Sequence, residues 1–392
     1  MKSDSTTHRI IDPGLAPRVA LVIGILGLIG AAVGFTVDRE QFFYSYLTSF
    51  VFWCSLALGA LFFVMLHHLS GSVWSVVLRR LAENVMLVLP LLGLLFVPLF
   101  FGLNELYAWG DPETVMADEI LQKKQLYLNP AFFSIRAIIY FALWSLLAIL
   151  LYRASVKQDK GHTQSLHGFF NKISAPGMIV FALTLTFAAF DWVMSLEAHW
   201  YSTIFGAYVF AGGVVGFLSV MTVLTVYLHS RGIMSNILST NHFHDLGRLL
   251  FAFIIFWAYM AFSQYFLIWY GNIPEETIWF LHRWVGSWKA ISLLIVFGHF
   301  GAPFFILITR FAKRSGTMLT IMGLWMLFMH WVDVHWMIMP VLHRDGFSLS
   351  WQDITTLVGI GGVLIWFFWT RMAAQPVIPV GDPKLEASLS LK

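Results

Sequence analysis

The chain contains only one cysteine, Cys54, which lies inside an apolar segment. A single cysteine excludes an intrachain disulfide, a cysteine-ligated iron–sulfur cluster and a CxxCH haem attachment. Any electron carrier that works with this chain is therefore a quinone, a haem between two histidines, or a cofactor of a partner protein. We expect the chain to bind no metal and no cofactor of its own.

Charged residues are also scarce. Asp, Glu, Lys and Arg make up 11% of the 392 residues and hydrophobic residues 58%, whereas soluble domains carry roughly 25% charged residues. The net charge of +3 is spread over the loops without a basic block, which argues against a nucleic-acid partner. Seventeen Trp and 37 Phe are typical of the interfacial belts and lipid-facing surfaces of membrane proteins.

Ten apolar runs are each long enough for a helix that crosses a bilayer, which takes about 20 residues. They lie near residues 17–36, 43–67, 82–103, 130–152, 174–195, 203–228, 246–270, 284–309, 317–339 and 352–372. The sequence thus predicts an all-α polytopic membrane protein with ten transmembrane helices. We expect an N-terminal segment (1–16), a transmembrane domain (17–372) and an unstructured tail (373–392).

Lysine and arginine are distributed unevenly between the two sides of this arrangement. Most of the 24 residues of these two types fall on the side that carries both termini. Because loops rich in Lys and Arg stay in the cytoplasm, we expect both termini to be cytoplasmic. The longest loop on the other side, 104–129, is acidic, and it is either a binding surface for a partner or simply a solvated loop.

Ionisable residues inside the predicted helices fall into two layers. The outer layer contains Arg136, Asp191, Lys289, His330 and Asp333. The inner layer contains His67, Glu83, Asp245 and Arg248, and His299 lies between the layers. Charge at such depth costs about 3 kcal/mol per residue, so we expect the outer acids and bases to pair inside the bundle. The layers indicate ion pairs that only fix helix packing, two wetted half-channels for protons, or a ligand site.

Two further classes of function stay open at this point. His299 and His330 are the best pair for a haem with two histidine ligands, although such interior histidines are more often simply hydrogen-bonded. Several glycines and prolines fit the broken helices of a secondary transporter, and fit close helix contacts or kinks equally well. They are Pro90, Pro98, Gly212, Gly213 and Gly216.

A weak internal repeat is visible in the spacing of polar residues. His67 precedes Glu83 by sixteen residues, and His229 precedes Asp245 by the same spacing. Each pair brackets a predicted cytoplasmic hairpin. This repeat hints at duplicated helical bundles, which are common in membrane proteins.

Three segments carry a family resemblance: 55–83, 190–213 and 261–284, the last of which reads AFSQYFLIWYGNIPEETIWFLHRW. They resemble the ActF-type membrane subunits of alternative complex III, which belong to the NrfD-like, polysulfide-reductase-type anchors. The resemblance runs along nearly the whole chain. It implies that helices 2–5 and 6–9 form two related four-helix bundles, flanked by helices 1 and 10.

The resemblance also implies a place in a quinol:electron-acceptor oxidoreductase complex of the bacterial inner membrane. The expected partners are a second NrfD-like subunit, an iron–sulfur protein, multihaem cytochrome c subunits and lipids, with a terminal oxidase as a further candidate. The quinol, the haem c groups and the iron–sulfur clusters would belong to those partners. This chain would support proton translocation and assembly; the alternatives are a purely structural anchor and an independent transporter.

One region departs from the paralogous subunit that resembles a true quinol site. The matching segment, FFGLNELYAW (100–109), lacks that subunit's His and its Arg-Pro-Trp motif. The candidates for contact with a quinone head group are then Asn104, Glu105 and Tyr107. We therefore expect that this chain is not itself the quinol-oxidising, catalytic subunit.

Overall fold

The computed structural model describes residues 2–4, 9–161, 166 and 168–391. In this part of the chain, ten helical segments are long and apolar enough to cross a membrane, which confirms the predicted all-α polytopic fold. They are α1 (Ala16–Val37), α2 (Arg39–Ser70), α3 with α4 and η1 (Val76–Phe101), α8 (Pro130–Gln158), α9 (Phe169–Trp192), α10 (Phe205–Ser230), α11 (Thr240–Gly271), α13 with η5 and α14 (Trp288–Leu307), α16 with η6 (Gly316–Val341) and α17 (Trp351–Ala374).

Local sequence determines where the long helices begin and end. Asp38 begins α2 because its side chain accepts the backbone N–H of Gln41 at 3.0 Å. Gly71 ends the same helix in the left-handed region, at φ +60°, which glycine adopts without strain. Asn129 begins α8 just before Pro130, whose fixed φ suits the first helical position.

Three of the crossings are not α-helical throughout, and in the ninth only the final segment, η6 (Met339–Val341), departs from the α-helix. The third is divided into α3 (Val76–Met86), α4 (Leu89–Leu95) and the 3₁₀ helix η1 (Val97–Phe101), and Pro90 and Pro98 lie in the first turns of the last two. The eighth consists of α13 (Trp288–Leu294), the π-helical segment η5 (Ile295–Gly301) and α14 (Ala302–Leu307). The glycines 212, 213 and 216 interrupt nothing, because α10 is continuous through them.

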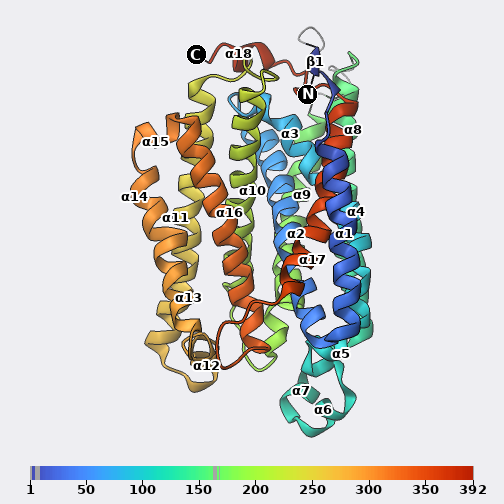
Figure 1. Ribbon diagram of the computed structural model, residues 1–392, viewed down its shortest axis with the longest axis vertical. Coiled ribbons are helices and arrows are strands. Elements are labelled where there is room, and N and C mark those ends of the chain that lie inside the picture. Colours follow the sequence, from blue (N-terminus) through green and yellow to red (C-terminus); the bar gives the residue numbers. More distant parts are fainter. Residues whose placement is uncertain (1, 5–8, 162–165, 167, 392) are drawn as a thin grey trace.

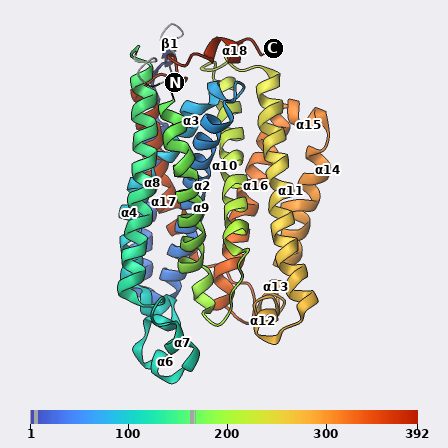
Figure 2. The same cartoon turned by 180° about the vertical axis from the view of Figure 1, so that it is seen from behind.

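The crossings form two groups that pack side by side. The first bundle comprises α2, α3 with α4, α8 and α9, and the second comprises α10, α11, α13 to α14 and α16. The second bundle lies on the left in Figure 1, and α8 and α9 of the first are seen from behind in Figure 2. Contacts between α2 and α10 join the bundles. The grouping agrees with helices 2–5 and 6–9 as separate bundles; a common origin of the two stays a prediction.

Helices α1 and α17 pack against each other beside the first bundle, as expected for flanking helices 1 and 10 (Figure 1). Their contact depends on glycines. A Cβ atom on Gly27 would lie 2.5 Å from the backbone nitrogen of Gly359, far inside van der Waals contact. Only glycine therefore permits this approach, which gains packing contacts along the two backbones.

Both termini lie at one end of the molecule, as an even number of crossings requires (Figure 1). We call this the terminal end, and the opposite one the loop end. The terminal end carries a short antiparallel ribbon, β1 (Lys2–Asp4) and β2 (Arg9–Asp12). The loop end carries α5 (Leu103–Leu106), α6 (Pro112–Ala117), α7 (Glu119–Lys124) and α12 (Pro274–His282).

The prediction of an unstructured tail is wrong for the described residues. The segment 376–391 crosses the terminal end and contains α18 (Leu385–Leu389) (Figure 1). Val377 and Ile378 are buried, and the Lys384 ammonium donates to the carbonyl of Gly71 at 2.6 Å. These apolar and polar anchors hold the tail in place despite its Pro- and Ser-containing composition.

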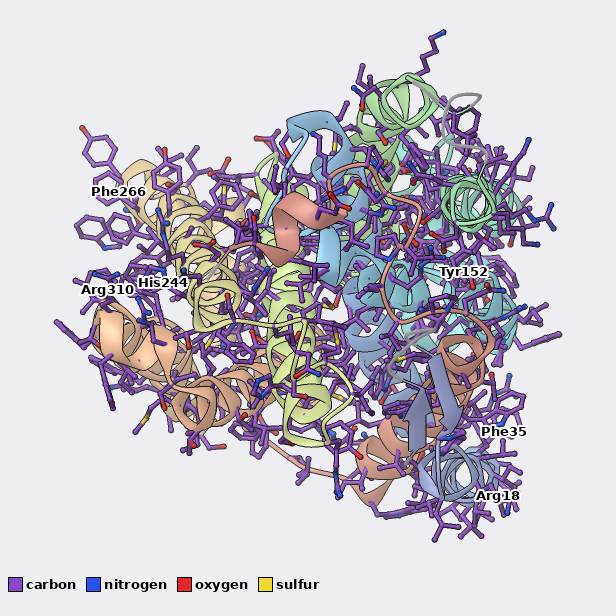
Figure 3. All side chains as sticks on the ribbon, turned by 90° about the horizontal axis from the view of Figure 1, so that it is seen from above. Arg18, Phe35, Tyr152, His244, Phe266 and Arg310 are labelled. Atoms are coloured by element: carbon purple, nitrogen blue, oxygen red, sulfur yellow. The ribbon has the colours of Figure 1, made fainter. Side chains whose placement is uncertain are left out.

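Large apolar side chains cover the outside of the bundles. Seen from above, Phe35 and Phe266 point away from the molecule (Figure 3). Their exposed fractions are 39% and 42%, and many other Phe, Leu, Ile and Trp residues are exposed in the same way. Such a surface is expected where lipid replaces water.

Candidate functional site

Asp333 of α16 is buried where α16 meets α10 and α11. Its carboxylate accepts the hydroxyl proton of Tyr208 on α10 and, at 3.1 Å, the indole N–H of Trp257 on α11. Both donors are neutral. Within the described ranges, no Lys or Arg forms an ion pair with Asp333.

Two histidines lie beside Asp333. His330 precedes it by one turn on α16, so the shared helix face predicted from their spacing is confirmed. His299 comes from η5, where π-helical hydrogen bonding replaces the regular pattern, as is common at functional sites. One side-chain N or O atom of each of the three residues lies within 4.8 Å of the others. We call Tyr208, Trp257, His299, His330 and Asp333 the central cluster.

The protein uses only part of the hydrogen-bonding capacity of the two imidazoles. His330 Nε2 lies 2.8 Å from Ser55 Oγ on α2, so this contact joins the two bundles. His299 stacks on Trp257 with ring centroids 3.7 Å apart. His330 Nδ1 and both ring nitrogens of His299 are buried without a hydrogen-bond partner among the described residues. Buried polar atoms are normally bonded, so the cluster presents unused donors and acceptors next to a carboxyl group.

Glycine makes room for His330 on the facing helix. A Cβ atom on Gly216 would lie 2.7 Å from His330 Cδ2, and one on Gly213 would lie 3.0 Å from the Ser55 carbonyl. Of the two interpretations of these glycines, close helix contact is therefore the one that the structure supports. They allow the imidazole to reach from α16 across α10 to α2.

Asp191 and Arg136 form a closed ion pair near the loop end of the first bundle. Arg136 donates through Nε and Nη2 to the two carboxylate oxygens, each at 2.8 Å, and the Tyr140 hydroxyl donates to one of them at 2.9 Å. The guanidinium also lies 3.9 Å from the centroid of the Tyr127 ring. Pairing of Asp191 with a base inside the bundle, as predicted, is confirmed.

The prediction that Lys289 also pairs inside the bundle is wrong. Lys289 lies on the outward face of α13 and is exposed, with its ammonium 5.3 Å from the centroid of the Trp284 ring. The position of Lys289 in the sequence predicted how deep it lies in the membrane, but not which face of the helix carries it. Asp333 is satisfied by neutral donors instead, so the two outer acids have different surroundings.

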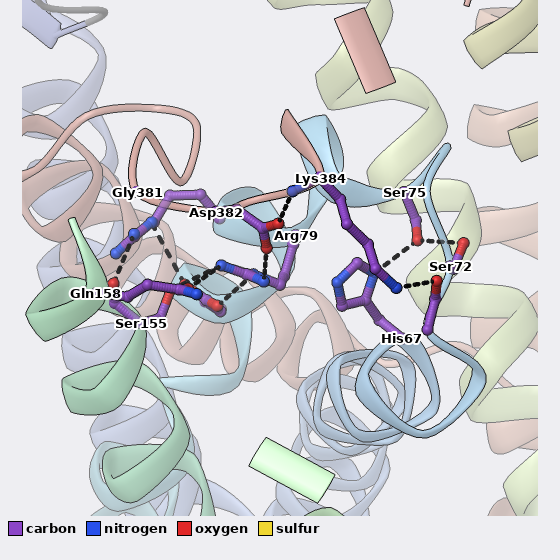
Figure 4. Close-up of polar contacts among 12 residues, drawn as sticks. His67, Ser72, Ser75, Arg79, Ser155, Gln158, Gly381, Asp382 and Lys384 are labelled. Atoms are coloured by element: carbon purple, nitrogen blue, oxygen red, sulfur yellow. Dashed lines mark hydrogen bonds and ion pairs between the residues drawn. The ribbon is translucent and has the colours of Figure 1, made fainter. Parts of the chain in front are cut away.

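At the terminal end, Glu83 is fully buried between two arginines. Its oxygens lie 3.1 Å from Arg79 Nε and 3.4 Å from Arg80 Nε, close enough for ion pairing although not aligned as hydrogen bonds. Arg79 also pairs with Asp382 of the tail (Figure 4), and Arg80 pairs with Asp159 at 2.5 Å. The tail thus completes a charge network over the end of the first bundle.

The other predicted inner residues do not join this network as one group. His67 is buried beside it, and its Nδ1 lies 2.7 Å from Ser75 Oγ (Figure 4). Asp245 and Arg248 form a separate pair at 3.4 Å on α11, and the Arg248 side chain is 66% exposed. Such an exposed pair contributes about 0–1 kcal/mol, so a role of these two in a buried path is not supported by their surroundings.

A third charge network at the loop end escaped the sequence analysis. Arg283 is buried and donates to Glu197 at 3.0 Å, and also to the backbone carbonyls of residues 279, 336 and 337. His282 Nδ1 lies 2.7 Å from the same carboxylate. Burial raises the pKa of Glu197, but Arg283 and His282 outweigh it, so the pKa lies below its ordinary value of 4.5. The network links the turn after α9 to α12.

Two of the three predicted quinone contacts, Glu105 and Tyr107, are engaged within the protein. Tyr107 is buried and donates to the carbonyl of Trp192 at 2.9 Å, whereas Glu105 pairs with Arg39 at 2.6 Å. Asn104 is exposed. The structure therefore gives these three residues no common polar site.

Comparison with known proteins adds no relative: no protein-family model matches the chain, and no curated protein matches it. Tyr208 and Trp257 of the central cluster, and Ser55 beside it, were not predicted, because a single polar atom on a side chain in an apolar run gives no signal in the sequence.

Proposed function

We propose that the chain is an ActF-type membrane subunit of a quinol:electron-acceptor oxidoreductase, and that its second bundle contains a proton-exchange site centred on Asp333. One contrast supports the site most. The buried acids Asp191 and Glu83 and the half-buried Glu197 each lie against an arginine, whereas Asp333 has only neutral donors. Asp353 is also buried without an arginine, but it caps the start of α17 through Ser350 and lies 3.8 Å from His335. A carboxylate without a cation in a medium of low dielectric constant favours taking up a proton.

The neighbours of Asp333 fit this role. When Asp333 is ionised, the Tyr208 hydroxyl and the Trp257 indole stabilise its negative charge. His299 and His330 each have a ring nitrogen within 4.8 Å of the carboxylate, a distance that one water molecule would bridge, and His330 extends the chain of polar atoms to Ser55. Both carboxylate oxygens already accept hydrogen bonds, which suits a proton site better than a metal site.

The proposal assigns the loop end to the outer side of the bacterial inner membrane and both termini to the cytoplasm, following the positive-inside rule. Protons would exchange at the central cluster from the outer side. On the cytoplasmic side, His67 and the Glu83 network lie under the tail. The haem c groups and iron–sulfur clusters would belong to partner subunits, since one cysteine cannot hold them, and quinol oxidation would take place on those partners.

The test measures protons released per electron transferred by the purified complex in sealed vesicles. Asp333→Asn keeps the shape of the side chain but removes the titratable group, so we expect quinol oxidation to continue with a lower proton-to-electron ratio. Asp345→Asn, at an exposed loop position, is the matched control. An unchanged ratio in a normally assembled Asp333→Asn complex would leave only an anchoring role.

A purely structural anchor is the second candidate, because the Asp191–Arg136 pair and the Glu83 network are closed and fix helix packing. Assembly with other subunits distinguishes such an anchor from an independent transporter. A tagged chain should co-purify with proteins that carry c-type haem, whereas a transporter would purify without them.

A further inference from the structure

The terminal end of the second bundle carries a group of basic side chains, where α11 packs against the short helix α15 (Arg310–Arg314). Arg248, Arg310 and Lys313 lie near enough to His244 to interact with it electrostatically. Arg314 follows Arg310 by one turn, on the same face of α15. Figure 3 shows His244 and Arg310 on the same side of the molecule. We call these five residues the basic patch.

The positive charge of the basic patch is only partly neutralised. Within the described residues one carboxylate pairs with it: Asp245 lies 3.4 Å from Arg248 and 3.8 Å from His244 Nδ1. Arg310 is exposed, and neither it nor Arg314 forms an ion pair in this part of the chain. Two guanidinium groups are therefore available to an anion from outside the protein.

Lys313 holds α15 in place between α14 and α11. Its ammonium donates to the carbonyls of Leu307 at 2.8 Å and Ile308 at 3.2 Å, at the end of α14. The same ammonium lies 5.0 Å from the centroid of the Phe251 ring on α11. A Cβ atom on Gly247 would lie 3.1 Å from Lys313 Cγ, so the glycine makes room for the lysine stem. The arginines of α15 thus start from a fixed position and not from a free loop.

Large apolar side chains lie beside the basic patch on the outward face of α14 and α15. Phe305 and Phe311 are each 73% exposed, and Ile308 is 53% exposed. A phospholipid presents a phosphate directly next to its acyl chains, and it therefore matches cations at the end of an apolar face. An acidic protein surface would match the cations but would leave these three apolar side chains without a partner.

We propose that the basic patch binds the head group of an anionic phospholipid, with the acyl chains packed on Phe305, Ile308 and Phe311. Arg310 and Arg314 would donate charge-assisted hydrogen bonds to the phosphate oxygens. The lipid would hold α14 and α15 against α11, next to the crossing that η5 interrupts. This inference goes beyond the proposed function, because lipid binding requires no proton transfer and does not depend on which side of the membrane carries the terminal end.

The test compares phosphatidylglycerol with phosphatidylcholine of the same acyl chains, binding to the full chain in mild detergent, by native mass spectrometry. We expect tighter binding of phosphatidylglycerol, and a preference that falls as added salt screens the charges. Arg310→Gln should raise the Kd for phosphatidylglycerol roughly fivefold, and Arg310→Gln combined with Arg314→Gln roughly 25-fold, as expected for the loss of one and of two cations. Arg18→Gln, an exposed arginine on the opposite side of the molecule (Figure 3), is the matched control and should bind normally.

Photolabelling in nanodiscs locates the site. Phosphatidylglycerol with a diazirine in its acyl chain should label peptides that contain residues 305–311, and the double variant should lose this label. Equal affinity for the two lipids, equal losses in Arg310→Gln and Arg18→Gln, or a label that the double variant keeps would overturn the assignment. So would an acidic subunit of the assembled complex that cross-links to α15 in place of the lipid. The single exposed substitution Arg310→Gln, with a melting profile like that of Arg18→Gln, gives a result even if the double variant does not fold.

Discussion

Asp191 and Asp333 are both buried aspartates in the half of the molecule nearer the loop end, but their neighbours differ in charge. Asp191 accepts two N–H groups of Arg136, whereas Asp333 accepts only from Tyr208 and Trp257. The two N–H groups of Arg136 bind the Asp191 carboxylate and hold α8 against α9. Asp333 has no such cation, and we propose that it exchanges a proton instead of fixing two helices.

Removing one partner of the Asp191 pair should be costly. Asp191→Asn leaves Arg136 buried without a counter-charge, and we expect a loss of about 3–5 kcal/mol, seen as a lower apparent unfolding temperature in detergent. Arg248→Ala, which removes one partner of an exposed pair, is the matched control and should change stability by about 0–1 kcal/mol. Equal effects of the two substitutions would contradict this account of Asp191.

The Glu197 network predicts a dependence on pH. The pKa of Glu197 is lower in the folded protein than its ordinary value of 4.5, so the ionised side chain stabilises the fold at higher pH. That contribution is lost as the pH falls below 4.5 and through the lowered pKa. The difference in unfolding temperature between the wild type and Glu197→Gln should therefore shrink with acidification; parallel curves would show that the network adds no stability.

At the scale of helices, the sequence predicted more than it did at the scale of contacts. Apolar runs gave all ten crossings, and the three-residue spacing placed His330 and Asp333 on one face. The outward orientation of Lys289 was not predicted, because the length and hydropathy of an apolar run indicate the depth of a residue but not the rotation of the helix about its axis. The tail was missed because its anchors, Val377 and Ile378, are two residues in a polar segment.

The α1–α17 contact can be tested with two glycine-to-alanine substitutions whose added methyl groups approach different atoms. Gly27→Ala would push against the backbone of Gly359, whereas Gly30→Ala would meet the Thr355 side chain at 2.8 Å, which can move. Overpacking of this kind typically costs about 1–3 kcal/mol. We expect Gly27→Ala to loosen α1 and speed its proteolysis, with a smaller effect of Gly30→Ala. The reverse order would contradict the role of Gly27 as a spacer between the two backbones.

Deletion of the tail should change hydrogen exchange in the elements that it covers. Deleting residues 382–392 removes Asp382 from Arg79 and Lys384 from Gly71. We expect faster hydrogen exchange in the loop before α3 and in the last turn of α8, which the tail covers at the terminal end. Lys384→Ala alone should affect the Gly71 side only. Unchanged exchange in both places would mean that the tail does not protect this end.

At the scale of the whole molecule, the two bundles differ in what they contain. The first holds closed ion pairs at both ends, and the second holds the central cluster beside a large aromatic cavity. Buried polar atoms without a partner among the described residues occur in both bundles, for example His68 Nε2 in the first, but in the second they lie beside a carboxyl group that has no arginine. The sequence alone did not distinguish the two bundles, because ionisable residues occur at similar depths in both.

Orientation can be checked on the whole chain. Cys54 is buried, so single cysteines can be added without strong background labelling. Glu386→Cys in the tail should react only when the cytoplasmic side is open to a membrane-impermeant thiol reagent, and Met116→Cys in α6 only from the other side. Labelling of both from the same side would contradict the ten-crossing topology.

Infrared difference spectroscopy of the complex during quinol oxidation tests the central claim most directly, because the C=O stretch of a protonated carboxyl group reports gain or loss of its proton. We predict a carboxyl band that changes during turnover, disappears in Asp333→Asn and persists in Asp345→Asn. A band that is the same in both variants, or no carboxyl change at all, would contradict proton exchange at Asp333.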